Sequence, residues 1–400
     1  MLFPNDVATG LTAGLSVPCA VQPIDLARSA SRAGFPVFYF GRREEAVGVG
    51  VAWRSDDLLA RPPSEGRLFF AFPFDGSRRA GSVVLPAVTL VKGEAGGRLH
   101  VAPGQEEMPA MLSRLEHPGE TPAPAGRVTA RDPESDVWAA MVERARETIG
   151  SGLLSKVVLA RSVTLAFDEV RPFDVVALLR ERFPDAFTYG WAENGSAFVG
   201  ASPELLVERR GESIRSFPLA GSAVRGSGSI DDAKSARALL GSAKDRSEHQ
   251  FVVDEIVRLL RPLTSEMSVP TRPTVVRVAN IQHLGTEIRG LLARPMGVVQ
   301  LAMALHPTPA VCGTPTAAAL SFIRDVETLD RGWYAGGVGW TDASGDGEAA
   351  VALRCALLQN HGARVYAGAG IVRDSDAAAE VAETEAKLRA LLDILQTDPL

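Results

Sequence analysis

A run of apolar residues, KVVLARSVTLAF at 156–167, is almost unbroken and has the pattern of a strand buried in the interior of a sheet. Hairpin patterns follow it, in which β-rich runs flank short turns at 193–196 and 210–213, and residues 336–358 repeat this pattern. Strands joined by such short turns pair antiparallel. The sequence therefore predicts strand meanders rather than regular βαβ repeats.

Helical segments interrupt these meanders. Apolar periodicity predicts helices that begin near Pro133, cover about 231–262 and occupy the tail at 376–395. Residues 1–115 hold short apolar runs separated by Gly, Pro and charged residues, a pattern that favours sheet with few helices. The Pro- and Gly-rich stretch at 116–135 is expected to be a long surface connection. Together these segments predict an α+β fold.

Composition excludes several classes of protein. The 400 residues are 46% hydrophobic and 22% charged with a net charge of -6, so no basic surface for nucleic acid is expected. No apolar run approaches the length of a membrane span, and the first basic residue is Arg28, so no charged signal-peptide start is expected either. Cys19, Cys312 and Cys355 are far apart and match no zinc spacing, which favours a reducing cytoplasm.

The helix predicted around DRSEHQFVVDEI, residues 245–256, carries acidic residues on its apolar side. A rotation of 100° per residue aligns Asp245 and Glu248 with Val252 and Ile256. An ionised carboxylate on a buried face costs several kcal/mol unless a cation meets it. We therefore expect a cation near Glu248.

The C-terminal helix repeats this arrangement, because Glu380, Glu383 and Lys387 fall on one arc beside its apolar stripe. Two readings are open. The side chains could form solvent-exposed ion pairs of about 0.3 kcal/mol each. Alternatively, the two acidic helices could hold a divalent cation, and oxygen-only ligands without a His or Cys cluster would then indicate Mg²⁺ completed by water and an anionic substrate.

Nine motifs in the second half occur in an order that resembles the chorismate-utilising enzymes, and isochorismate synthases in particular. They are SKVVLAR (155–161), FVGASPELLV (198–207), FPLAGSAVRG (217–226), DRSEHQFVVDEI (245–256), QHLGTEIRG (282–290), LHPTPAVCGTP (305–315), GGVGWTDASGDGEAAVALRCALL (336–358), YAGAGIV (366–372) and ETEAKL (383–388). The resemblance covers about 135–395 and little of 1–130. It implies one domain over 1–400, with two packed, mainly antiparallel sheets flanked by helices.

The resemblance also implies a reaction, the Mg²⁺-dependent conversion of chorismate to isochorismate. Lys156 matches the general base that deprotonates the attacking water, and Glu204 matches the general acid that protonates the leaving hydroxyl. Without the neighbouring motifs, Lys156 would be a strand-end lysine reaching solvent and Glu204 a residue opening an edge strand.

Other residues match positions that bind the metal ion or the substrate in this family. Glu248 and Glu383 match metal ligands of the family, with Asp245 and Glu380 one helical turn earlier as outer-sphere or water-mediated partners. Other positions match groups that bind substrate carboxylates or line the cleft. These are Arg354, Lys387, Gly221, Ser222, His283, Thr286, Ala310, Gly368 and Gly370.

The family contains several reactions. Ala220 stands where enzymes that form aminodeoxychorismate have a lysine, so water is the expected nucleophile. Salicylate synthase, which forms isochorismate and then eliminates pyruvate, is the alternative, and a non-catalytic chorismate-binding module is a third reading. The expected protein is a cytoplasmic monomer whose product could serve siderophore, salicylate or menaquinone biosynthesis.

Overall fold

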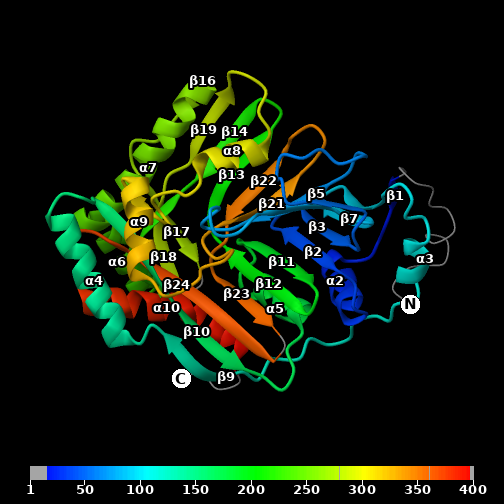
Figure 1. The fold of residues 1–400 in the computed structure, drawn as a ribbon, viewed down its shortest axis with the longest axis horizontal. Coiled ribbons are helices and arrows are strands. Elements are labelled where there is room, and N and C mark those ends of the chain that lie inside the picture. Colours follow the sequence, from blue (N-terminus) through cyan, green and yellow to red (C-terminus); the bar gives the residue numbers. More distant parts are fainter. Residues whose placement is uncertain (1–15, 279, 360, 397–400) are drawn as a thin grey trace.

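The computed structural model describes residues 16–278, 280–359 and 361–396. Within this part of the chain, two large antiparallel sheets and one small sheet are flanked by helices (Figure 1). The predicted α+β fold with two mainly antiparallel sheets is therefore confirmed, and the small third sheet is an addition. None of the described helices is long and apolar enough to cross a membrane.

The larger sheet has twelve strands and contains the catalytic candidate Lys156 on β10 and the substrate-binding candidates Gly368 and Gly370 on β24. In spatial order its strands are β1 Ser16–Pro18, β8 Gly96–Val101, β7 Val88–Gly93, β3 Glu45–Val49, β2 Val37–Gly41, β11 Phe187–Glu193, β12 Ser196–Ser202, β23 Cys355–Gln359, β24 Gly362–Ile371, β10 Lys156–Ala166 and β20 Gly313–Thr314, with β9 Arg127–Asp132 also paired to β10. The apolar run beginning at Lys156 is thus a buried strand between β24 and β20, as predicted.

Two smaller sheets accompany the large one, and strands of the third sheet line part of the candidate site. The nine strands of the second sheet are β16 Thr264–Ser268, β19 Ile288–Leu292, β14 Ser213–Phe217, β13 Leu205–Arg210, β22 Gly347–Val351, β21 Gly337–Thr341, β5 Leu68–Phe72, β6 Ser82–Leu85 and β4 Trp53–Ser55. The third sheet contains β15 Leu219–Val224, β18 Ile281–Gly285 and β17 Thr274–Val278. All three predicted hairpins are confirmed, as β11–β12, β13–β14 and β21–β22.

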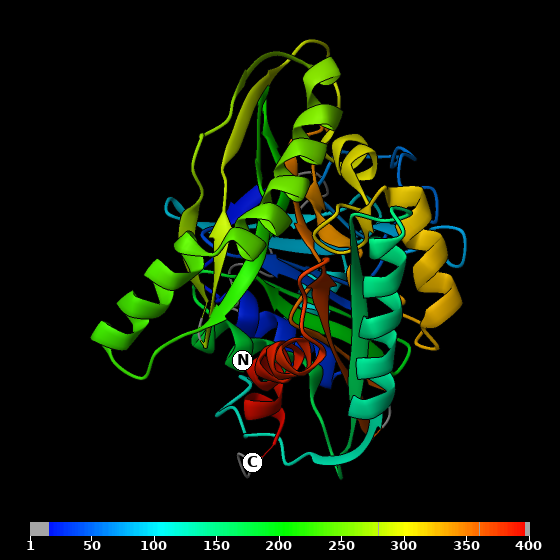
Figure 2. The same cartoon turned by 90° about the vertical axis from the view of Figure 1, so that its left-hand side faces the viewer.

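Helices cover the outer faces of the sheets. They are α2 Pro23–Arg32, α3 Met108–Leu112, α4 Ser135–Gly150, α5 Pro172–Arg182, α6 Ser229–Gly241, α7 Ala243–Leu260, the 3₁₀ turn η1 Arg261–Leu263, α8 Val298–Leu305, α9 Thr316–Val326 and α10 Ala377–Leu395. Helix α7 packs against β15, and α10 packs against both β15 and β24 (Figure 2). The two acidic helices of the sequence therefore both contact strand β15.

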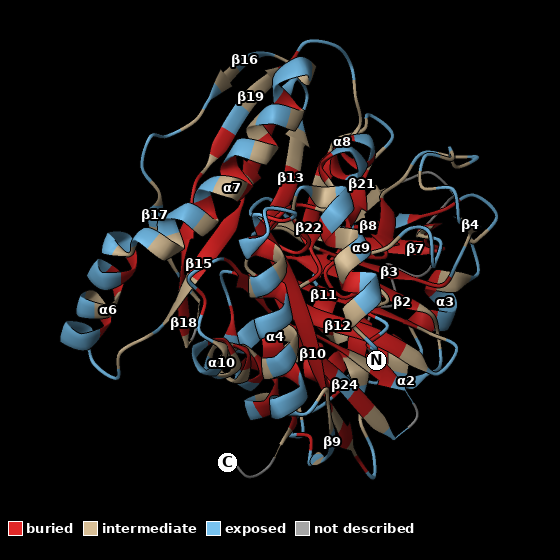
Figure 3. Ribbon diagram, turned by 60° about the vertical axis from the view of Figure 1, so that its left-hand side comes forward, coloured by how far each residue is buried: buried red, intermediate tan, exposed pale blue. Residues whose placement is uncertain are grey.

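The alternation of side chains along β2 separates two apolar cores. Phe38 and Phe40 point into a core between the two large sheets, where Phe38 lies 6.2 Å from the ring of Phe69. Val37 and Tyr39 point the other way, into a core between the twelve-stranded sheet and helices α2, α5 and α10. Buried residues accordingly concentrate in the strands, while the outer faces of the helices are exposed (Figure 3).

The stretch at 116–135, which was predicted to be a long surface connection, contains a strand near its end. Its end, Arg127–Asp132, forms β9 and pairs with β10. The reason is that β10 is longer than the strands beside it. Its second half would otherwise leave unpaired backbone groups at the sheet edge, and β9 satisfies them.

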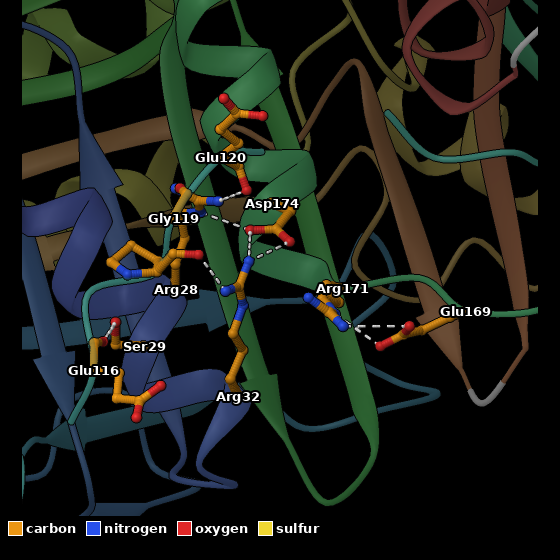
Figure 4. Close-up of polar contacts among 10 residues, drawn as sticks. Arg28, Ser29, Arg32, Glu116, Gly119, Glu120, Glu169, Arg171 and Asp174 are labelled. Carbon is orange, nitrogen blue, oxygen red and sulfur yellow. Dashed lines mark hydrogen bonds and ion pairs between the residues drawn. The ribbon is translucent and has the colours of Figure 1, made fainter. Parts of the chain in front are cut away.

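A group of charges that includes the buried side chains of Arg28 and Asp174 fixes the beginning of the same stretch (Figure 4). The carboxylate of Asp174 on α5 accepts hydrogen bonds from Arg28 at 2.6 Å and from Arg32 at 2.9 Å, both on α2. The remaining N–H groups of Arg28 donate to the carbonyls of Gly119 at 3.0 Å and Glu120 at 2.9 Å. We call Arg28, Arg32 and Asp174 the α2 clamp, because they join two helices and the connection.

Candidate active site

Lys156, the first residue of β10, is fully buried, and its amine lies 3.1 Å from the carboxylate of Glu248 on α7. The amine makes no well-aligned hydrogen bond within the described residues. Gly370 on β24 allows this approach, since a Cβ there would lie 2.2 Å from Glu248 Oε1 and 2.9 Å from Lys156 Cε. The cation expected near Glu248 is therefore, in this structure, the amine of Lys156.

Glu204 lies between β12 and β13 and is 3% exposed. Burial raises the pKa of its carboxyl group to about 8, although the backbone N–H of Leu219 and the cations Lys156, Arg354 and Lys387 act in the opposite direction. At neutral pH the side chain is consequently a carboxylic acid that can donate a proton, even though three basic side chains surround it.

A chain of polar contacts connects Arg354 to the acidic helix α10. Arg354 Nη2 donates to Nε2 of the buried His283 at 3.1 Å, so the ring proton is on Nδ1, which faces the carbonyl of Gly221 at 3.2 Å and Ser222 Oγ at 3.1 Å. Burial and the charge of Arg354 hold the pKa of His283 well below its usual value, which keeps the ring neutral. The Ser222 hydroxyl can then donate to Glu383.

The backbone of Arg354 itself has an unusual conformation. Its φ of 48° is in the left-handed region, which costs a non-glycine residue about 1–3 kcal/mol. The carbonyl oxygen of Arg354 accepts a hydrogen bond from Ala201 N at 3.0 Å. A Cβ added at Gly200 would lie 2.9 Å from the same oxygen. These contacts hold the strained residue and direct its buried guanidinium toward His283.

Lysines accompany the carboxylates of α10. Lys387 Nζ lies 2.5 Å from Glu383 Oε1 and donates to the carbonyl of Gly368 at 2.9 Å. Glu380 is 1% exposed and forms an ion pair of 2.5 Å with Lys244 on α7. Burial and the nearby Glu383 raise the pKa of Glu380. For Glu383, burial also acts upward, but Lys387, Lys244 and Ser222 outweigh it and lower the pKa.

Lys244 lies among the carboxylates of both acidic helices. Burial acts to lower the pKa of its amine, but the charges of Glu380, Glu383 and Glu248 outweigh this effect and raise it. In the part of the chain that the structure describes, no three acidic, His or Cys side chains gather at metal-ligand spacing. Three carboxylates and three lysines alternate here, because Glu248, Glu380 and Glu383 pair with Lys156, Lys244 and Lys387.

A narrow cavity of about 50 Å³ lies at the centre of these groups. The predicted site residues that line it are Glu204, Gly221, Ser222, Glu248, His283, Ala310, Arg354, Gly368, Gly370 and Lys387. The remaining ones do not line it: Lys156, Asp245, Thr286, Glu380 and Glu383. Glu380 and Glu383 lie behind Lys387 and Lys244, and Asp245 packs on Gly221, whose added Cβ would meet it at 3.0 Å.

Thr286 supports the site from behind. Its hydroxyl is 2.7 Å from Nε2 of the buried His249, and burial together with Lys156 lowers the pKa of that histidine to about 4. The sequence prediction missed His249 and Lys244. It also missed Tyr334 and Tyr366, which stack on each other and line the cavity. Each missed residue is next to or within four positions of a recognised motif residue, but its type alone gave no signal.

The chain is similar to proteins of one family. A family model described as chorismate binding enzyme matches residues 77–396. The salicylate biosynthesis isochorismate synthase of Pseudomonas aeruginosa is 38% identical over 364 residues, which cover 85% of this chain and 76% of that protein. A protein named putative isochorismate synthase MenF, from Mycobacterium tuberculosis, is 43% identical over 380 residues, covering 90% and 96%.

Solved structures agree with these similarities. The menaquinone-specific isochorismate synthase MenF from Escherichia coli superposes with a TM-score of 0.84 at 28% identity, over 98% of this chain and 97% of that one. A putative 2,3-dihydroxybenzoate-specific isochorismate synthase, DhbC from Bacillus anthracis, has a TM-score of 0.78 at 31% identity, over 90% and 96%.

Proposed function

The chain belongs to the chorismate-binding enzyme family, and we propose that it is an isochorismate synthase. It is a hydroxymutase that acts on chorismate, adding water at C2 while the C4 hydroxyl leaves. One observation carries the chemical part of this proposal. Glu204, a carboxylic acid that is protonated at neutral pH, lines the cavity, and the fully buried Lys156 lies 3.1 Å from Glu248, which also lines it, so a base and an acid are available together.

Each of the two catalytic candidates has one task. Lys156 accepts a proton from the water whose oxygen forms the new bond at C2. The ring double bond shifts, the bond from C4 to its hydroxyl breaks, and Glu204 gives its proton to that hydroxyl so that water leaves. Hydroxide is a poor leaving group, so the raised pKa of Glu204 supports this assignment.

Arg354 and Lys387 are the proposed partners of the two carboxylates of chorismate. Both line the cavity, and the guanidinium of Arg354 can bind a carboxylate with two parallel hydrogen bonds. Gly368 and Gly370, with Gly221, keep the backbone close to the ligand. The cavity of about 50 Å³ is narrow, so side chains that line it would move when chorismate enters.

We assign Mg²⁺ to the acidic residues of α7 and α10. Glu248 and Glu383 are the proposed direct ligands, and Asp245 and Glu380 the outer-sphere or water-mediated partners. When bound, the ion would neutralise these carboxylates and hold a carboxylate of the substrate. The support is local, since Lys244 and Lys387 already bring positive charge to carboxylates that are otherwise buried together.

Product analysis tests the proposal. Purified protein with Mg²⁺ and chorismate should yield isochorismate on chromatography, and a chelator should abolish product until Mg²⁺ is restored in excess. Salicylate and pyruvate as the main products would instead establish a salicylate synthase. Equal, negligible rates for the wild type and Lys156→Ala would establish a non-catalytic binding module. Lys234→Ala, at an exposed position of α6, is the matched control and should keep full activity.

The remaining assignments follow the same proposal. We propose one catalytic domain, because strands from 1–130 and 135–395 pair within both large sheets, and a monomer, because one chain supplies every site residue. Cys19, Cys312 and Cys355 are unpaired, which supports a cytoplasmic enzyme. Isochorismate formed there would enter siderophore, salicylate or menaquinone biosynthesis. Light scattering in solution tests the monomer.

A further inference from the structure

A second cavity lies on the other side of Tyr366, the tyrosine that also lines the active-site cavity. Its volume is about 450 Å³, which is within the range of small-molecule sites. Aromatic rings form much of its wall. The ring of Trp333 lies edge to face with Trp191 at 5.3 Å and with Phe198 at 5.8 Å. The cavity can therefore bury one planar ring against existing aromatic surfaces.

Among the described residues, the charges around this cavity leave one cation, Arg364, without a partner. Arg79 pairs with Asp330 at 3.2 Å, and Glu193 pairs with Arg54. The guanidinium of Arg364, which projects from β24 and is exposed, makes no ion pair or hydrogen bond with any residue that the structure describes. An anion entering the cavity would thus meet Arg364 without first breaking an ion pair.

From this combination we propose that the second cavity binds a planar aromatic carboxylate. Its ring packs against Trp333, and its carboxylate accepts paired hydrogen bonds from Arg364. A neutral aromatic compound would lack the charged contact, and an aliphatic carboxylate would lack the ring contacts. The site thus selects for both features in one ligand.

The cavity is mechanically connected to the active site. Trp333 lines the second cavity, whereas the next residue, Tyr334, lines the active site and stacks on Tyr366 at 5.1 Å. Arg331, also in the second cavity, donates to the carbonyls of Val158 at 2.8 Å and Val311 at 2.9 Å, and both of these residues line the active site. A bound ligand should therefore change turnover without competing with chorismate.

Calorimetric titration with benzoate tests the site without depending on turnover. The wild type should bind one benzoate, and phenol and cyclohexanecarboxylate should each bind at least tenfold more weakly. Arg364→Gln should weaken benzoate binding about tenfold or more while leaving the basal turnover unchanged. Arg237→Gln, at another exposed arginine on α6, is the matched control and should bind benzoate like the wild type.

Two further measurements separate this site from the active site. Benzoate should still bind to Arg354→Gln, which lacks the cation proposed for the substrate, and should bind weakly to Trp333→Leu. In wild-type kinetics, benzoate should change kcat. The proposal is overturned if the wild type binds no benzoate at millimolar concentration, if Arg364→Gln binds it normally, if binding is lost in Arg354→Gln, or if benzoate changes only KM.

Discussion

The α2 clamp and the active site both bury charged side chains, but they differ in how completely those charges are bonded. In the clamp, Asp174 accepts from two arginines, and the other N–H groups of Arg28 reach the carbonyls of Gly119 and Glu120 (Figure 4). Hydrogen bonds to every charged group repay the loss of hydration. The clamp therefore holds two helices and a connection in place and has no free capacity to react.

In the active site the bonding is incomplete. Lys156 is as deeply buried as the clamp, yet its amine has one carboxylate neighbour and no well-aligned hydrogen bond, and Nδ1 of His249 has no partner among the described residues. Such groups cost stability but remain available to a ligand. In this comparison the fully bonded charges hold the structure together, whereas the incompletely bonded amine of Lys156 lies in the candidate active site.

The largest effect should come from Lys156→Ala. Loss of the general base should lower kcat/KM per folded molecule about 10²–10⁴-fold, and removal of the cation beside the carboxylate of Glu248 should lower the melting temperature as well. Turnover and thermal unfolding of the same preparation measure the two effects. A collapse of stability with the activity per folded molecule retained would show that Lys156 resembles the clamp instead.

Asp174→Ala should have the opposite profile. It leaves Arg28 buried without its carboxylate, which should reduce the free energy of unfolding by about 3–5 kcal/mol. Urea unfolding measures this loss, and kcat of the folded fraction should equal that of the wild type. A decrease in kcat of the folded protein would contradict the division of roles between the two charge clusters.

The pH dependence of the rate tests the role of Glu204 as the general acid. Its pKa of about 8 exceeds the ordinary value of 4.5, so the acid is protonated below pH 8 and loses its proton above it. Above the pKa of Glu204 in the enzyme–substrate complex, kcat should therefore decrease, and the decrease should approach tenfold per pH unit. Glu204→Gln should be slow at every pH and lack this limb. An unchanged limb in that variant would assign the titration to another group.

The smallest effect is expected from Arg171→Ala. Arg171 pairs with Glu169 at 2.7 Å next to the clamp, but both side chains are exposed to solvent (Figure 4). An exposed pair contributes about 0.5 kcal/mol or less to the free energy of unfolding. Urea unfolding should hardly distinguish this variant from the wild type, and a loss as large as that of Asp174→Ala would mean that bonding and burial do not explain the clamp.

Local patterns were sufficient to predict most elements and part of the site. Alternation and turn residues predicted the hairpins, and helical periodicity placed Glu248 toward the interior and Asp254 toward solvent, as the structure has them. The same rules could not find β9, because its strand character comes from pairing with β10 rather than from its own residues. They also could not assign a counter-ion to Glu248, since no local rule relates it to Lys156, which is 92 positions away.

The sequence by itself determined which segments become strands and helices and which carboxylates face inward. These features depend on the spacing of apolar and polar residues that are close together in the chain. Only the tertiary structure decided that Lys156 and Lys244 meet those carboxylates and that Glu204 is protonated at neutral pH. The reason is physical. Dehydration and Coulomb interactions depend on distance in space, and the sheets bring together β10, α7 and α10 from distant parts of the chain.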